Sequence, residues 1–185
     1  IVWNQSQQLL GEVIKVYMKD STINRAHVIG QALSVEQLPD STNYNQVSSD
    51  EMFAFFRNGE IYEADANDNV LIVYYPVDDS DSSLIGLNYT ETTQLKVFLE
   101  NRKMKKVWMP KAEGTLYPMS QIPPAKRFLP SYAWFDYVRP LNKDDIFNWR
   151  GKKAGTELKV VARKEAPLQH LSGKPSASDS IPVDR

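Results

Sequence analysis

The chain has 185 residues, of which 42% are hydrophobic and 24% are charged, enough for one sizeable domain with a hydrophobic core. Its formal net charge is -1, from 22 basic and 23 acidic residues spread along the sequence, so charge draws neither nucleic acid nor an anionic membrane surface to it. The sequence has no cysteine, which excludes disulfides, thiolate metal sites and a cysteine nucleophile.

Neither a membrane span nor an export signal is visible in the sequence. No apolar run reaches the roughly 18 to 20 residues of a membrane-spanning helix. The first residues, IVWNQSQQLLGE, lack the basic start and apolar core of a signal peptide. Any export signal is therefore expected to have been removed beforehand.

Three segments of the chain share one pattern and follow each other at intervals of about 40 residues, a spacing typical of repeat architectures. They are residues 14–28 (IKVYMKDSTINRAHV), 52–66 (MFAFFRNGEIYEADA) and 95–109 (LKVFLENRKMKKVWM). Each contains a strand pattern, turn residues and a second strand pattern, so each copy is expected to form a β-hairpin.

In the first strand of every copy, alternate residues are apolar, which predicts that one face of a sheet is buried. These residues are Ile14, Val16 and Met18 in the first copy, Met52, Ala54 and Phe56 in the second, and Leu95, Val97 and Leu99 in the third. The opposite face carries Tyr17, Phe55 or Phe98 in the three copies, so it is expected to be half-exposed or covered.

The turns are expected at residues 20–22, 58–59 and 101–103. Asn58-Gly59 is the strongest of them, because these two residues tolerate the positive φ angles that match strand twist. A further strand is expected at 31–37 and again at 69–75. Such units stack because none buries its apolar face alone; the alternative is an ordinary meander of three hairpins without true repetition.

Residues 113–150 are rich in proline and aromatic residues. They are expected to form an irregular segment, with one or two short helices, that packs on or beside the sheets. Alternatively, Trp134 and Phe135 would form a docking patch for a partner. Residues 151–185 are expected to hold one more strand, near 156–166, and a mobile tail.

Side chains suited to metal binding or nucleophilic catalysis are few. His27 and His170 are the only histidines of the sequence, and they are too few and badly placed for a metal site or a catalytic triad. The acidic loop 78–81 lacks the glycine and the distal glutamate of an EF-hand and is expected to be solvated. No metal or cofactor is expected.

One carboxylate cluster near a turn, Glu60, Glu63 and Asp65, resembles the acid pairs of glycoside hydrolases in composition alone. Nothing in the sequence fixes the distance between these carboxylates. An enzyme is therefore not expected.

Several short motifs carry a resemblance to a known family. Gly30-Gln31-Ala32 ends the strand of VIGQALSV, and LLGEVIKVYMKDSTI surrounds Gly11 at the start of the first copy. The second copy keeps FFRNGEI but has Asp68-Asn69-Val70 at its end, and the third departs further with Pro110-Lys111-Ala112. Over residues 1–112 this pattern resembles the OstA-like family of lipopolysaccharide-transport proteins, whose repeats place a turn with Asn, Asp or Gly between two strands and end near Gly-Asn-Ala.

The resemblance implies a fold and a role. The fold is a repeat-built, open antiparallel β-jellyroll of two facing sheets over residues 1–112. The role is non-enzymatic: acyl chains of a lipopolysaccharide bind in the greasy interior and pass across the periplasm towards the outer membrane. The nine apolar residues of the first strands would line that interior.

The same resemblance implies a periplasmic or outer-membrane-associated protein. Its expected partners are lipopolysaccharide, other transport proteins bound through edge strands, and head-to-tail copies of itself. The alternative is a structural or protein-interaction β-repeat module whose core is closed and packed.

Overall fold

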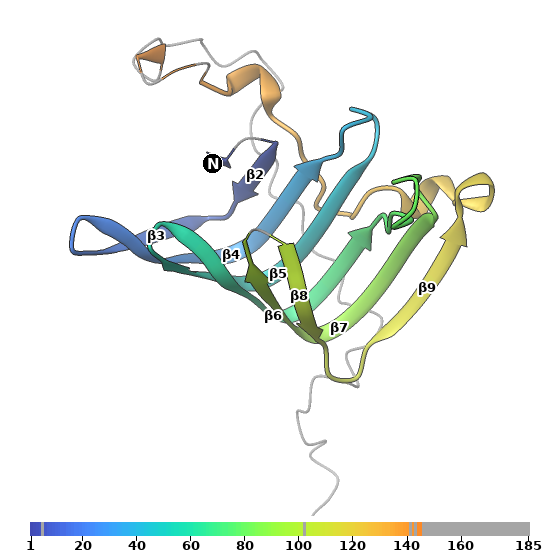
Figure 1. Ribbon diagram of the computed structural model, residues 1–185, viewed down its shortest axis with the longest axis horizontal. Helices are drawn as coiled ribbons and strands as arrows, with labels where there is room; N and C mark the ends of the chain where they lie inside the picture. The colour runs from blue at the N-terminus through green and yellow to red at the C-terminus, as the bar shows by residue number, and fades with distance from the viewer. Residues whose placement is uncertain (5, 102, 141, 143, 146–185) are drawn as a thin grey trace, which may run out of the picture.

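The computed structural model describes residues 1–4, 6–101, 103–140, 142, 144 and 145, and this part of the chain is built from β-strands and short 3-10 helices (Figure 1). The strands are β1 (Val2–Asn4), β2 (Gln7–Leu10), β3 (Val13–Lys19), β4 (Thr22–Gln37), β5 (Tyr44–Arg57), β6 (Glu60–Tyr74), β7 (Gly86–Glu100), β8 (Lys103–Trp108) and β9 (Glu113–Pro118). The 3-10 helices are η1 (Met119–Gln121), η2 (Pro124–Lys126) and η3 (Asp136–Val138).

All nine strands belong to one open antiparallel sheet, which confirms the predicted fold class. The strand order is β1-β2-β4-β5-β6-β7-β8, with β3 paired to β4 and β9 paired to β7. The resemblance implied two facing sheets; the structure has one sheet, whose long strands run through both of its halves.

The long strands bend along one line that crosses the sheet. The pairing register shifts at residues 29–32 of β4, 48–51 of β5 and 67–70 of β6. The shifts lie side by side, since Glu51 pairs with Ile29 on one side and with Asn67 on the other. Because a bulge bends its strand, a row of aligned bulges folds the sheet into a trough (Figure 1).

The edge strands are interrupted at the same line. β2 pairs with residues 33–36 of β4 and β3 pairs with residues 22–29, so β2 and β3 together follow the bend of β4. Gly11 lies at the break between them, where a Cβ atom would stand 2.2 Å from a Val28 side-chain carbon. At the other edge, β8 and β9 divide β7 in the same way.

Left-handed backbone conformations make the bend possible in β4 and β6. Gly30 and Gln31 have φ angles of 73° and 46°, and Asp68 and Asn69 have φ angles of 59° and 51°. Glycine and asparagine adopt this region at the lowest cost among the amino acids. Separate strands were expected to begin near 31 and 69; instead β4 and β6 continue through these residues.

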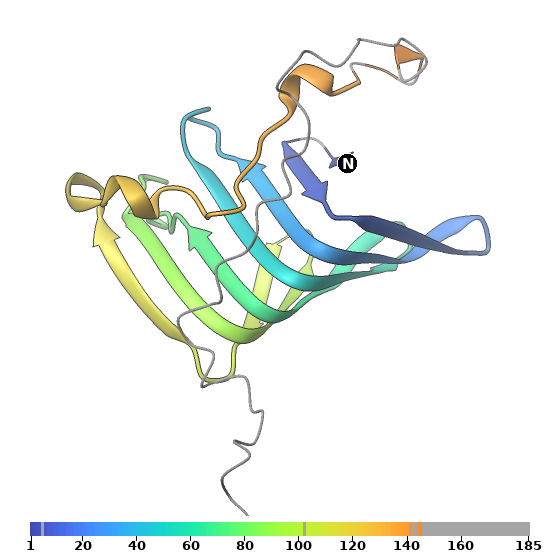
Figure 2. The same cartoon turned by 180° about the vertical axis from the view of Figure 1, so that it is seen from behind.

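We name the two halves of the sheet by what accompanies them. The hairpin arm contains β3, β8 and the parts of β4, β5, β6 and β7 that form the three predicted hairpins. The strap arm contains β1, β2 and β9 and is covered on its outer face by residues 119–135, here called the strap. Figure 2 shows the strap running from the end of β9 across the long strands towards β2.

The hairpin turns of the first two copies are tight. Asn58 and Gly59 have φ angles of 53° and 79° between paired residues Arg57 and Glu60, as the Asn-Gly signal predicts. Asp20 and Ser21 adopt the same left-handed region in the first copy. In the third copy, Glu100 pairs with Lys103.

The outer face of the hairpin arm is a mixed aromatic and charged surface. Two rows of paired residues cross it, Lys15-His27-Phe53-Asp65-Lys96-Trp108 and Tyr17-Arg25-Phe55-Glu63-Phe98-Lys106. His27 stacks on Phe53 with ring centroids 4.2 Å apart, and the Arg25 guanidinium lies 4.3 Å from the Tyr17 ring centroid. The rings cover each other and the cations cover the rings, which explains a face that is aromatic yet half-exposed.

The strap buries the outer face of the strap arm. Its buried residues, Ile122 and Leu129, complete a core with the strand residues Leu10, Leu33, Val35, Val73 and Leu87 and with Tyr75, which follows β6. Two buried glutamines hold it: Gln8 accepts from the Phe135 N–H and donates to the Ala133 carbonyl, both at 2.8 Å. Gln46 makes the same pair of bonds with Leu129 and Arg127, both at 2.9 Å.

The C-terminal part differs from the expectation at one point and extends past the described residues at another. Residues 113–118, expected to open an irregular segment, form strand β9 against β7. The strap and the short 3-10 helices follow. The strand expected near 156–166, the tail and His170 lie outside the described residues.

Candidate functional site

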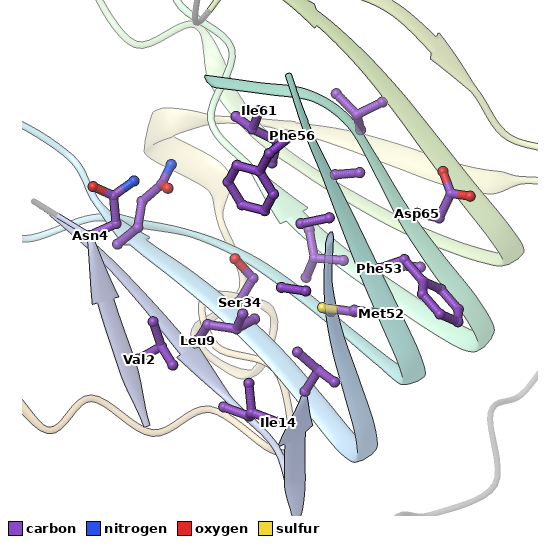
Figure 3. A pocket seen from close by; sticks show the side chains of 18 of the residues that line it. Val2, Asn4, Leu9, Ile14, Ser34, Met52, Phe53, Phe56, Ile61 and Asp65 are labelled. Carbon is purple, nitrogen blue, oxygen red and sulfur yellow. The ribbon is translucent and has the colours of Figure 1, made fainter. Parts of the chain in front are cut away.

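An apolar groove of about 290 Å³ runs between the two arms. Figure 3 shows Val2, Asn4 and Leu9 on the side of the strap arm and Phe56 and Ile61 on the side of the hairpin ends. The remaining lining residues come mostly from the inner face of the hairpin arm, including Ile14, Val16, Ile23, Ala26, Val28, Met52, Ala54, Ala64, Ala66, Leu95 and Val97. The inner face of the trough therefore presents a predominantly hydrocarbon surface, with polar residues such as Asn4 and Ser34 among its lining.

The nine alternating apolar residues predicted for the first strands of the three copies are here called the stripe. Seven of them line this groove. They are Ile14, Val16, Met52, Ala54, Phe56, Leu95 and Val97. Met18 and Leu99 do not line it; both precede the hairpin turns, and Met18 is 59% exposed. The alternating pattern places all nine on one face, but at the hairpin ends the groove is lined by Ile23, Phe56 and Ile61 and does not extend to Met18 and Leu99.

A row of alanines keeps the groove open. Ala26, Ala54 and Ala64 pair with one another across β4, β5 and β6, between Val16 and Val97. The neighbouring row, closer to the bend, is buried and carries three larger side chains, Val28, Met52 and Leu95, beside one alanine, Ala66. Since methyl side chains fill little of the space above the sheet, the trough is packed at its bottom and hollow above the alanine row.

The strap-arm wall of the groove was not predicted. It includes Leu9 of β2, Ser34 of β4 and Val47 of β5. The bulges shift the side-chain alternation in part of the long strands, so a period counted from the hairpins cannot be carried across the bend. These residues could have been assigned to the same face as the stripe only if the bend, with its pair of left-handed residues inside a strand, had been recognised.

Two members of the carboxylate cluster suspected from the sequence, Glu63 and Asp65, belong to the paired rows of the outer face, and Asp65 is also one of the residues that line the groove. Lys96 Nζ is 2.6 Å from an Asp65 carboxylate oxygen and 3.4 Å from a Glu63 oxygen. The hydrogen bond to Asp65 is the main cause that raises the pKa of Lys96 above its usual value. The two carboxylates thus share one cation, an arrangement of an outer-face ion-pair network.

The other polar features have structural partners. In the loop 78–81, Asp78 and Asp81 accept hydrogen bonds from the backbone of Ser80 and Ser83. These bonds and those of the serine hydroxyls lower the pKa of both carboxyls. No group of three or more metal-binding side chains occurs among the described residues. His27 is largely covered by its contacts with Phe53 and Glu51.

The proposed docking residues are engaged within the molecule. The Trp134 ring lies 5.1 Å from the Trp3 ring and 5.4 Å from the Tyr44 ring, measured between centroids. Phe135 is anchored through its N–H to Gln8. Trp134 and Phe135 therefore fix the strap to β1, β2 and β5.

Comparison with protein-family models, with curated proteins and with solved structures found no match. In the part of the chain that the structure describes, no helix has the length and apolar character needed to cross a membrane.

Proposed function

We propose that this protein binds the acyl chains of a lipid in the groove between its arms and acts as a non-enzymatic carrier. The observation that supports this best is the hollow above the alanine row, whose walls are almost entirely hydrocarbon. Apolar surface of this kind is stabilised when hydrocarbon replaces water, at roughly 25 cal/mol per Å² buried. Lipopolysaccharide as the lipid, and the periplasm or outer membrane as the location, come from the resemblance to the OstA-like family.

The exposure of the lining argues against a closed, packed interior. Val16 is 49% exposed and Ile23 is 42% exposed, although both carry aliphatic side chains on the inner face. A packed module would bury such residues, because leaving them in water forfeits the main driving force of folding. The same exposure is what an acyl chain would cover.

The sheet edges suit transfer between proteins. β8 lies at one edge of the sheet, and all its residues are exposed, including Met104, Val107 and Trp108. An edge strand offers backbone donors and acceptors to a partner strand. We propose that other transport components, or further copies of this chain, pair with such edges so that grooves line up.

The test is photo-crosslinking from the groove in cells. A photoreactive residue at Val97 faces the hollow, and the same residue at Phe98, its neighbour on the outer face, is the matched control. Lipopolysaccharide is expected to become attached at Val97 and not at Phe98.

The result against the proposal is equally clear. A folded Val97 variant that gives no lipid adduct, or equal adducts at both positions, would contradict binding in the groove. Attachment of a protein at both positions would favour the interaction module instead.

A further inference from the structure

A second, polar pocket of about 390 Å³ lies between the ends of the first two hairpins. The pairing of β4 with β5 ends at Arg25 and Phe55, so the hairpin ends, residues 19–24 and 56–62, extend beyond the paired region. The pocket occupies the space between these ends.

The lining of this pocket differs in chemistry from that of the groove. It comprises Lys19, Asp20, Thr22, Ile23, Asn24, Phe56, Arg57, Asn58 and Tyr62. Two of these residues are cations and one, Asp20, is a carboxylate, while the amides of Asn24 and Asn58 add hydrogen-bond donors. Lining of this composition favours a small anion.

The turn geometry gives the two cations a defined setting. The Thr22 hydroxyl donates to the Lys19 carbonyl at 2.9 Å and closes the first hairpin end. The Arg57 guanidinium lies 4.7 Å from the Tyr62 ring centroid, so its aliphatic stem and planar group are supported by the ring. A supported guanidinium retains its planar fork of donors for an oxyanion.

The polar pocket adjoins the apolar groove. Ile23 and Phe56 line both of them. A molecule whose hydrocarbon chain lies above the alanine row can therefore extend its polar end past Ile23 and Phe56 to the hairpin ends.

We propose that the polar pocket binds the anionic, phosphate-bearing headgroup of an amphiphile whose acyl chain occupies the groove. This assignment rests on the proposed lipid binding and adds a specificity site to it: Lys19 and Arg57 select a phosphate over a neutral headgroup. Phosphate, a compact oxyanion, is matched by an arginine fork and a lysine ammonium.

The experiment compares two amphiphiles with the same chain. Equilibrium binding of 1-oleoyl lysophosphatidate and of 1-oleoylglycerol is measured below their micelle concentrations, for the wild-type chain, for a Lys19→Gln/Arg57→Gln variant and for Arg25→Gln. Arg25 is the matched control, because it stacks on Tyr17 as Arg57 does on Tyr62 but does not line the pocket.

The expected result is a preference of about tenfold for the phosphate-bearing lipid in the wild type, the size of one or two charge-assisted hydrogen bonds at a half-exposed site. The double variant is expected to lose this preference while binding 1-oleoylglycerol unchanged, and Arg25→Gln to retain it. Raising the salt concentration is expected to weaken the preference.

Four results would overturn the inference, and they separate it from the proposed function. Binding of both lipids without a phosphate preference, or a preference that survives in the double variant, refutes the headgroup site and leaves the groove. Absence of binding of either lipid refutes the groove and the headgroup site together. Displacement of lysophosphatidate by inorganic phosphate at similar concentration and constant ionic strength would mean a free-anion site instead.

Discussion

The Gln46 side chain binds the strap as a neighbouring strand would: its oxygen accepts from the Leu129 N–H while its amide nitrogen donates to the Arg127 carbonyl, two residues earlier. Gln8 repeats this arrangement with Phe135 and Ala133. Each glutamine supplies one acceptor and one donor to alternate residues of an extended segment. The backbone groups of the strap thus obtain hydrogen-bond partners although the strap is not a strand of the sheet.

Replacing Gln46 with alanine should destabilise the protein by about 2 to 4 kcal/mol, because two buried strap groups lose their partners. The free energy of unfolding, measured with urea, is the readout. Gln7→Ala removes an exposed glutamine of β2 and should change stability by less than about 0.5 kcal/mol. Equal effects of the two substitutions would show that the bonds to the strap contribute little.

Filling the hollow should block binding without unfolding the chain. Ala54→Leu adds a side chain above the alanine row and should cost less than about 1 kcal/mol, since space is available. Lipid binding should fall strongly. Ala32→Leu is the contrast: Ala32 is 0% exposed at the bend, and the larger side chain should cost about 1 to 3 kcal/mol.

That comparison decides between a hollow and a packed interior. If Ala54→Leu destabilises the chain as much as Ala32→Leu does, the space above the alanine row is filled in solution. Unchanged lipid binding by a stable Ala54→Leu variant would place the ligand elsewhere.

A charge on the inner face should be tolerated at the rim and not at the bottom. Val16 is 49% exposed, so Val16→Glu should leave folding nearly intact and reduce lipid uptake. Val28 is 1% exposed, and Val28→Glu should cost more than about 3 kcal/mol. Circular dichroism with thermal unfolding, followed by lipid binding, checks both; unfolding of both variants alike would indicate a closed core.

Alkaline pH should loosen the strap through Tyr132 and through two tyrosines of the core that the strap completes, Tyr75 and Tyr89. Burial raises the pKa of Tyr132 far above its usual value, and burial also raises the pKa of Tyr75 and Tyr89. Because the folded state holds these protons more tightly than the unfolded chain, the stability they contribute is complete below about pH 10 and falls as the pH rises above it.

Tyr132→Phe removes one titratable hydroxyl, and with it that group's contribution to the pH dependence of stability. At pH 8 the variant should be less stable than the wild type by up to about 1 kcal/mol, the cost of a lost hydroxyl contact. At pH 11 the deficit should shrink or reverse, as urea unfolding at the two pH values would show. A deficit that stays constant, or that Tyr17→Phe on the exposed outer face shares, would exclude Tyr132 as the sensitive group.

The local part of the fold was predictable because it depends on near neighbours. Alternating apolar residues around Asn58-Gly59 define a hairpin and its inner face wherever it lies in the molecule. The stripe residues that line the groove, among them Val16 and Val97, follow from that alternation alone.

The features that depend on the bend were not predictable from the pattern. Strand boundaries were expected at Gln31 and Asn69. Both residues do have turn-like φ angles, but the strands continue through them. Gln8 and Gln46 alternate as solvent-facing residues do, and only the strap shows why they are buried. The alanine row looks like a poor core until the opposite arm is placed above it.

The line of bulges also determines how the groove responds to a ligand. Since the arms share the same strands, the angle between them is maintained by covalent backbone and ladder hydrogen bonds rather than by side chains meeting across the hollow. Emptying the groove removes little that keeps the arms apart, so the cavity is preorganised and an incoming chain spends little free energy on reshaping the protein. Under the carrier function proposed above, a lipid would enter and leave with nearly the same backbone, so that it could be passed on without refolding of the protein.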